Sequence, residues 1–228
     1  MPRRNRVDPW GDLVAHPARG MFTGNRGCVV DDRGRVVRHH GNNLLWITCR
    51  LEFRGRRVEL ARPNRWTPLF FLDDAVALAA GHRPCGECRH TDYLAYRDGV
   101  TAATGSGPPL RAAELNRRLA DERLRHGRGL SRAADRILWR APIDRLPDAT
   151  VVLDAAGRPS LLVGETLRPF SLDGWGAAVP VPDGPVTVLT PPTSVGALAH
   201  SFVPVLHPSA HALGRPPAGV ASRQDSEV

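Results

Sequence analysis

The sequence contains no lysine, so all 31 basic residues are arginine. Alanine, glycine and proline are abundant as well, and together these biases are typical of GC-rich coding. The arginine count is therefore weak evidence for phosphate recognition, although it gives the chain a formal net charge of +8. Two explanations of this positive charge stay open, a surface that binds a polyanion and a basic face that is only solvated.

Long apolar runs are also missing. No stretch approaches the roughly 18 apolar residues that a membrane-spanning helix needs. The first residues, MPRRNRVDPWGD, carry charge but no apolar segment of the kind found in secretory signals. We therefore expect a cytoplasmic protein with no membrane partner.

Cysteine is scarce, with four residues in a chain of 228. That number is too small for a disulfide scaffold at this length, so metal binding or plain buried thiols are the expected uses. The hydrophobic fraction of 42% and the charged fraction of 24% are those of an ordinary globular protein with a real core.

Charge is distributed unevenly along the chain. Residues 1–140 hold 26 basic and 15 acidic residues, whereas the remainder holds 5 and 8. The basic excess therefore lies in the N-terminal part, which is the better candidate for a polyanion surface.

The pattern of turns and apolar runs predicts an α+β protein. We expect a flexible arm over residues 1–25, a zinc-binding domain with a small antiparallel sheet over 26–100, a linker with basic helices over 101–145, a β-rich unit over 146–207 and a disordered tail over 208–228. In FFLDDAVALAAG, Asp73 is a candidate N-cap of a short helix, and Gly81 fits the position just past its end. Leucines at 110, 115, 119 and 124 predict a second helix.

The stretch GHRPCGECRH carries the clearest chemical signal. A C-x-x-C pair after a tight turn, here Cys85 and Cys88, places two thiolates on one metal with little strain. Thioredoxin-like redox chemistry would instead need the pair at the start of a helix within a βαβ pattern, which the sequence does not show. Two buried thiols without a metal are the third possibility.

A zinc ion needs further ligands, since its structural sites are four-coordinate. Cys49 and Cys28 are the other cysteines, and both fall in the predicted sheet. Zinc is the expected cofactor because it favours thiolate-rich tetrahedral sites.

Residues 46–92, which include the stretch FFLDDAVALAAGHRPCGECR, resemble the metal-binding domain of the Ada family of DNA-repair proteins. That resemblance implies a small α/β unit in which four cysteines hold zinc, and one of them accepts a methyl group from a methylated DNA phosphate. Cys85 and Cys88 match the second ligand pair, and Cys49 matches the first cysteine of the other pair and would be the methyl acceptor.

The chain departs from the family pattern in the first pair. The family has a proline and a second cysteine where this chain has Leu51 and Phe53. Cys28 could supply the fourth thiolate, or water could complete the site. A histidine is the other alternative, and the candidates are His39, His40, His82 and His90. With histidine or water in place of one thiolate, the site is less negatively charged and a poorer methyl acceptor.

Arginines surround the predicted centre and could form a face that contacts nucleic-acid phosphates. The candidates are Arg50, Arg54, Arg56, Arg57, Arg83 and Arg89. Arginines on edge strands also discourage aggregation, so this second explanation stays open. The aromatic residues Trp46, Trp66 and Phe53 are expected to form a small core more than to stack on bases.

Three functions are consistent with these patterns. The first is a zinc-binding protein that binds DNA or other nucleic acid through its arginines. The second is an enzyme or methyl acceptor that uses a zinc thiolate or an open zinc position on an alkylated substrate. The third is a structural zinc module that supports protein–protein interaction.

Overall fold

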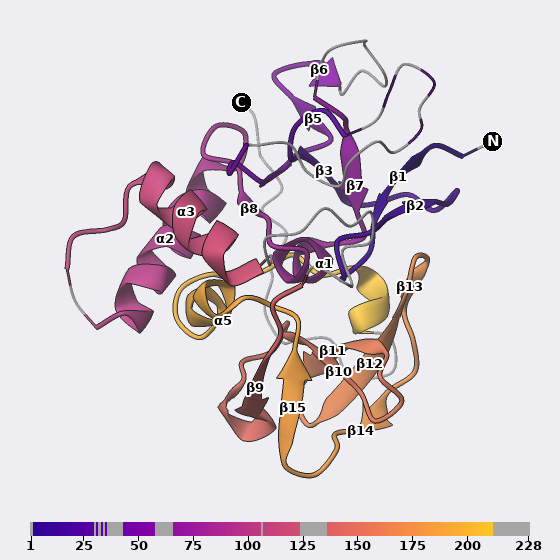
Figure 1. Ribbon diagram of the computed structural model, residues 1–228, viewed down its shortest axis with the longest axis vertical. Helices are drawn as coiled ribbons and strands as arrows, with labels where there is room; N and C mark the ends of the chain where they lie inside the picture. The colour runs from indigo at the N-terminus through magenta and orange to yellow at the C-terminus, as the bar shows by residue number, and fades with distance from the viewer. Residues whose placement is uncertain are drawn as a thin grey trace, which may run out of the picture.

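The computed structural model describes residues 2–29, 31, 33, 35, 43–57, 66–105, 107–123 and 136–211. In this part of the chain no helix combines the length and the apolar character needed to cross a membrane. Two β-sheets and several short helices make up the structure, which confirms the predicted α+β class (Figure 1).

The first sheet has six strands in the order β2-β1-β7-β3-β4-β8 and mixes parallel with antiparallel pairs. A separate hairpin, β5–β6, follows β4 and turns at Arg54 and Gly55, both with positive φ. The strands have the bounds β1 Arg4–Val7, β2 Leu13–Ala15, β3 Phe22–Asn25, β4 Ile47–Cys49, β5 Glu52–Phe53, β6 Arg56–Arg57, β7 Leu69–Phe71 and β8 Arg83–Pro84.

The second sheet is antiparallel and has the order β13-β12-β11-β10-β15-β9, with β14 paired to β12. Its strands are β9 Trp139–Pro142, β10 Val151–Leu153, β11 Pro159–Val163, β12 Thr166–Ser171, β13 Gly174–Trp175, β14 Val179–Pro180 and β15 Pro185–Val188. This sheet confirms the predicted β-rich C-terminal part, but β9 starts earlier than the expected boundary at 146.

Helix α1, Asp74–Ala79, lies between the two sheets, and all of its residues are buried (Figure 1). One hydrophobic core joins them, with Leu69 and Phe71 from the first sheet, the alanines of α1, and Val151 and Leu161 from the second. A helix packed on both sides needs small side chains, which explains its alanine-rich sequence. The predicted zinc-binding and β-rich units therefore pack against each other around α1.

The predicted ends of α1 are confirmed. Asp73 is the N-cap, and its side chain accepts a hydrogen bond from the backbone N–H of Val76. Gly81 has a φ of 83°, a left-handed conformation that favours glycine just past the end of a helix.

In the described part of the chain, three more helices pack together in a second hydrophobic cluster that includes Leu78 of α1. They are α2 His90–Ala103, α3 Ala112–Arg123 and α5 Pro192–Leu198, and short 3-10 turns lie at Ile143–Arg145 and Pro208–Ala210. Leu115 and Leu119 of α3 are buried, as their spacing predicts, whereas position 124 lies outside the described residues. Helices α2 and α5 approach closely at Gly99, where a Cβ atom would come within 2.8 Å of the Ala197 carbonyl oxygen.

The N-terminal segment differs from its prediction. Residues 1–25 were expected to form a flexible arm, but β1, β2 and β3 are strands of the first sheet, and Val7 and Leu13 belong to the core. Each of these strands has only three or four residues. A strand this short shows no clear alternation of apolar and polar residues, so only its pairing with other strands identifies it. Helix α2 also extends to Ala103, into the predicted linker. The first residues of the tail predicted over 208–228 form a 3-10 turn with Ala210 in the core, and positions 212–228 lie outside the described part.

Replacing Gly24 by alanine should destabilise the protein by about 3 kcal/mol, because overpacking a closely paired strand forces the backbone apart. An added Cβ would lie 2.1 Å from the carbonyl oxygen of Ile47 on β4. Urea unfolding measures the change. The matched control is Gly157→Ala, where nothing lies within 4 Å and only the positive φ of 75° opposes alanine, at about 1 kcal/mol. Equal losses in the two variants would contradict the close β3–β4 packing.

Candidate metal centre

The structure brings Cys49, Cys85 and Cys88 together, with their sulfur atoms all within 4.8 Å of one another. Cys49 ends β4, while Cys85 and Cys88 lie in the turn between β8 and α2. Strands β4 and β8 are parallel and pair Thr48 with Pro84, so the next residues, Cys49 and Cys85, lie beside each other at the same end of the two strands. The backbone N–H of Cys85 also donates to the Thr48 carbonyl oxygen at 2.9 Å.

Backbone N–H groups point at the sulfur atoms, as expected for thiolates that bind a metal. The N–H of Glu87 donates to Cys85 Sγ at 3.4 Å. The backbone N–H of Cys88 acts to lower the pKa of Cys85, and that of Arg50 acts to lower the pKa of Cys88. Hydrogen bonds from the thiols of Cys49 and Cys88 to the sulfur of Cys85 lower the pKa of Cys85. The pKa of Cys49 is raised, because its thiol must keep its proton to donate these hydrogen bonds. The cluster therefore favours at least one thiolate at Cys85.

Three converging sulfurs fit a soft, thiolate-binding metal such as zinc. A redox pair needs only two cysteines, and the third cysteine in the cluster has no role in that chemistry. Helix α2 does begin two residues after Cys88, closer to a redox arrangement than the sequence suggested. The convergence of Cys49 with the C-x-x-C pair nevertheless favours a metal site.

Three of the predicted fourth ligands, Cys28, His82 and His90, are not in the cluster. Cys28 is exposed and is not among the three converging cysteines. His82 is fully buried, and its ring packs against Trp46 and Phe71. His90 is exposed, and its Nδ1 lies 2.9 Å from the Gly86 carbonyl oxygen. The described residues thus supply three ligands.

His39 and His40 lie outside the described residues, so their prediction as ligands stays open. Burial lowers the pKa of His82 well below its usual range, with the nearby arginines Arg26 and Arg123 adding to the effect. A neutral His82 that packs between aromatic rings is a core residue. Trp46 is buried as predicted, whereas Trp66 is 45% exposed.

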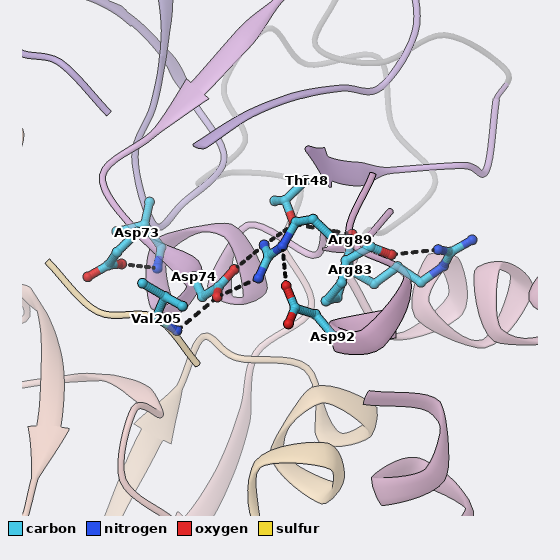
Figure 2. Close-up of polar contacts among 9 residues, drawn as sticks. Thr48, Asp73, Asp74, Arg83, Arg89, Asp92 and Val205 are labelled. Carbon is cyan, nitrogen blue, oxygen red and sulfur yellow. Dashed lines mark hydrogen bonds and ion pairs between the residues drawn. The ribbon is translucent and has the colours of Figure 1, made fainter. Parts of the chain in front are cut away.

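The sequence predicts Arg89 as a phosphate ligand, but in the structure Arg89 is buried and is the centre of an ion-pair network (Figure 2). Its Nη1 and Nη2 donate to the two carboxylate oxygens of Asp74 at 2.6 and 2.9 Å, and its Nε donates to Asp92 at 2.7 Å. It also donates to the Thr48 hydroxyl, and its guanidinium lies 4.1 Å from the centre of the Phe22 ring. This residue connects the cysteine turn to α1 and β4.

Arg83 is buried as well, which again differs from its predicted contact with phosphates. Its Nε donates to Asn116 Oδ1 on α3 at 2.8 Å. Its Nη1 donates to the Pro84 carbonyl oxygen, and Figure 2 shows Arg83 beside the Arg89 network. The sequence shows that both arginines neighbour the cysteines, but it does not show how far their side chains are buried. Their burial could therefore not be predicted.

The remaining predicted phosphate ligands lie in the segment after Cys49. Arg50 and Arg54 are exposed, and the Arg54 guanidinium lies 5.0 Å from the Phe53 ring centre. The side chains of Arg56 and Arg57 lie outside what the structure describes.

Asp74 is the residue that sequence reasoning missed. Both oxygens of its carboxylate bind Arg89, and Oδ2 also accepts the backbone N–H of Val205. The pair Asp73-Asp74 next to an apolar run was a usable signal, because adjacent carboxylates in a buried segment require partners. The sequence pattern predicts a role for Asp73 alone, as the N-cap of the helix.

Comparisons with protein-family models, with curated proteins and with solved structures give no significant match to this chain.

Replacing Arg89 by methionine should destabilise the protein by about 3–5 kcal/mol, because Asp74 would be left charged and buried without its partner. Urea unfolding with zinc in excess measures the loss. Arg97→Met on helix α2, which begins directly after Arg89, is the control, since Arg97 pairs with the half-exposed Asp98 and its replacement should cost less than about 1 kcal/mol. A loss of similar size in the two variants would show that the Arg89–Asp74 pair does not hold the fold together.

Proposed function

We propose that this protein binds zinc through Cys49, Cys85 and Cys88. The observation that supports the proposal is the convergence of three sulfurs from two separate elements within 4.8 Å. The backbone N–H groups directed at the sulfurs stabilise the thiolate form that zinc requires. The resemblance of residues 46–92 to the Ada metal-binding domain agrees with the same metal.

We further propose that the fourth coordination position is open to an external ligand. Structural zinc sites have four protein ligands, whereas sites that bind or activate another molecule keep one position open. The described residues supply three, and Cys49 and Cys88 are both partly exposed. Bound zinc supplies Lewis acidity at this position, and the chain positions the incoming ligand.

The exposed arginines favour a nucleic acid as the partner. Arg50 directly follows the ligand Cys49, and Arg54 lies on the hairpin that comes next. With a net charge of +8 and most of the basic excess in residues 1–140, the protein would attract a polyanion toward this side of the centre. In this proposal the zinc shapes the surface and Arg50 and Arg54 contact phosphates.

Alkyl transfer to a cysteine is a second candidate. Its support is the partial exposure of Cys49, which ends β4 at the surface and is the position that matches the methyl acceptor in the Ada resemblance. Three thiolates leave the zinc centre with a net charge of −1, which makes the sulfurs weaker nucleophiles than in a four-cysteine site. Incubation with methylated DNA followed by peptide mass analysis would detect a methyl group on Cys49, and an unmodified Cys49 would exclude this candidate.

Zinc content of single-cysteine variants tests the ligand set. Cys49→Ser, Cys85→Ser and Cys88→Ser should each lose most of the bound zinc, because two thiolates hold it far more weakly than three. Cys28→Ser is the control and should retain about one zinc per chain, since Cys28 lies outside the cluster. Metal analysis of the purified proteins gives the answer. Zinc loss in the Cys28 variant would contradict the open position, and absence of zinc from the unmodified protein would contradict the whole proposal.

Salt dependence of DNA binding tests the partner. Fluorescence anisotropy with a short labelled duplex should show a dissociation constant that rises steeply with salt concentration. The double variant Arg50→Gln with Arg54→Gln should weaken binding and reduce the slope of log K against log salt by about 2.

The control for that experiment removes the same charge elsewhere. Arg117 on α3 and Arg145 in the 3-10 turn are exposed, and the double variant Arg117→Gln with Arg145→Gln should leave the slope nearly unchanged. Equal effects of the two double variants would show that binding depends on the net charge of the protein and not on contacts made by Arg50 and Arg54. No binding at low salt would show that the nucleic-acid proposal is wrong and would leave the zinc proposal intact.

A further inference from the structure

A second basic site lies at the other end of the first sheet. A cleft of about 320 Å³ is lined by residues of β1, β7 and the segment after β2. These residues are Pro2, Arg3, Asn5, Arg6, His16, Pro17 and Phe70. The sheet order β2-β1-β7-β3-β4-β8 separates this cleft from the cysteines on β4 and after β8.

The sheet itself explains why a polar cleft forms here. Val7 and Phe71 point into the core toward α1. Because alternate residues of a strand point to opposite faces, Arg6 and Phe70 lie on the outer face of the sheet. Strands β1 and β7 pair these two residues directly, and the Arg6 guanidinium lies 4.6 Å from the centre of the Phe70 ring.

Arg6 is held in place by neutral groups. Its Nε donates to the Ala18 carbonyl oxygen, and its Nη1 donates to Asn5 Oδ1 at 2.8 Å. No described carboxylate forms an ion pair with it, and its partial burial lowers the pKa of the guanidinium from its usual value. A fixed arginine with remaining N–H donors and no counter-ion is suited to bind an oxyanion.

The other lining residues strengthen the positive character of the cleft. Arg3 is exposed and makes no ion pair with any described residue. The Nδ1 of His16 accepts the backbone N–H of Ala18 at 3.2 Å, so its proton is on Nε2 in the neutral form. The nearest acid to that Nε2 is Asp173 at 3.9 Å, which is not among the lining residues and has a side chain 76% exposed.

We propose that this cleft binds a phosphate monoester. Two arginines and a histidine match the two negative charges of that group, and Arg6 offers the forked donors that phosphate accepts in pairs. The volume is at the lower end of the range for small-ligand sites, so the site accommodates the phosphate and a small attached group beside Phe70. The phosphate could belong to a free small molecule or to the end of a nucleic-acid strand.

Titration calorimetry with phenyl phosphate, and separately with a 5′-phosphorylated oligothymidine, tests the site and distinguishes the two sources. Arg6→Gln should weaken binding by about 10-fold to 100-fold, since a charge-assisted hydrogen bond contributes about 1.5–3 kcal/mol. Arg3→Gln should weaken it several-fold, and because Arg3 is exposed this variant should fold normally. Arg145→Gln, which removes an exposed charge outside the cleft, should leave the affinity unchanged.

Binding of phenyl phosphate that both cleft variants weaken would support a small-molecule site. Binding of the phosphorylated oligonucleotide alone, weakened in the same way, would support a strand end as the source. If neither probe binds the unmodified protein, or if both cleft variants bind as well as Arg145→Gln does, the proposal is wrong. The result with phenyl phosphate does not depend on Arg50, Arg54 or the cysteines, which lie outside the cleft, so failure of the zinc or nucleic-acid proposal would leave this one standing.

Discussion

The buried ion pair between Arg89 and Asp74 is the interaction on which the arrangement of the candidate metal centre depends. Asp74 begins the helix that lies between the two sheets, and Arg89 directly follows Cys88. The two-pronged contact, at 2.6 and 2.9 Å, fixes the cysteine turn against α1, and the bond from Arg89 to Thr48 fixes it against β4. The position of Cys49 relative to Cys85 and Cys88 follows from these contacts.

The same helix connects the metal centre to the C-terminal half of the chain. Asp74 accepts the backbone N–H of Val205, and Asp73 accepts both the Trp175 indole N–H at 2.6 Å and the His207 backbone N–H at 3.0 Å. Burial raises the pKa of Asp73, while these donors oppose the rise. Both adjacent carboxylates thus connect the two halves of the protein by accepting N–H donors of the C-terminal half, and Asp74 also forms the ion pair with Arg89.

The fold class and part of the candidate site could be predicted from the sequence. The α+β class, the capped helix from Asp73 to Gly81 and the C-x-x-C turn all rest on local patterns, and local patterns suffice for them. The pairing of β4 with β8 and the depth of Arg83 and Arg89 depend on contacts between distant segments, which a single sequence does not display. For the same reason Cys28 was a plausible ligand in the sequence although it lies outside the cluster in space.

The central claim is that three cysteine sulfurs hold a zinc ion with one position left for another ligand. X-ray absorption spectroscopy at the zinc edge of the purified protein tests it most directly, because it counts sulfur neighbours at about 2.3 Å separately from lighter ligands at about 2.0 Å. The account predicts three sulfur neighbours and one oxygen or nitrogen neighbour. Four sulfurs would contradict the open position, and a protein without bound zinc would contradict the metal centre itself.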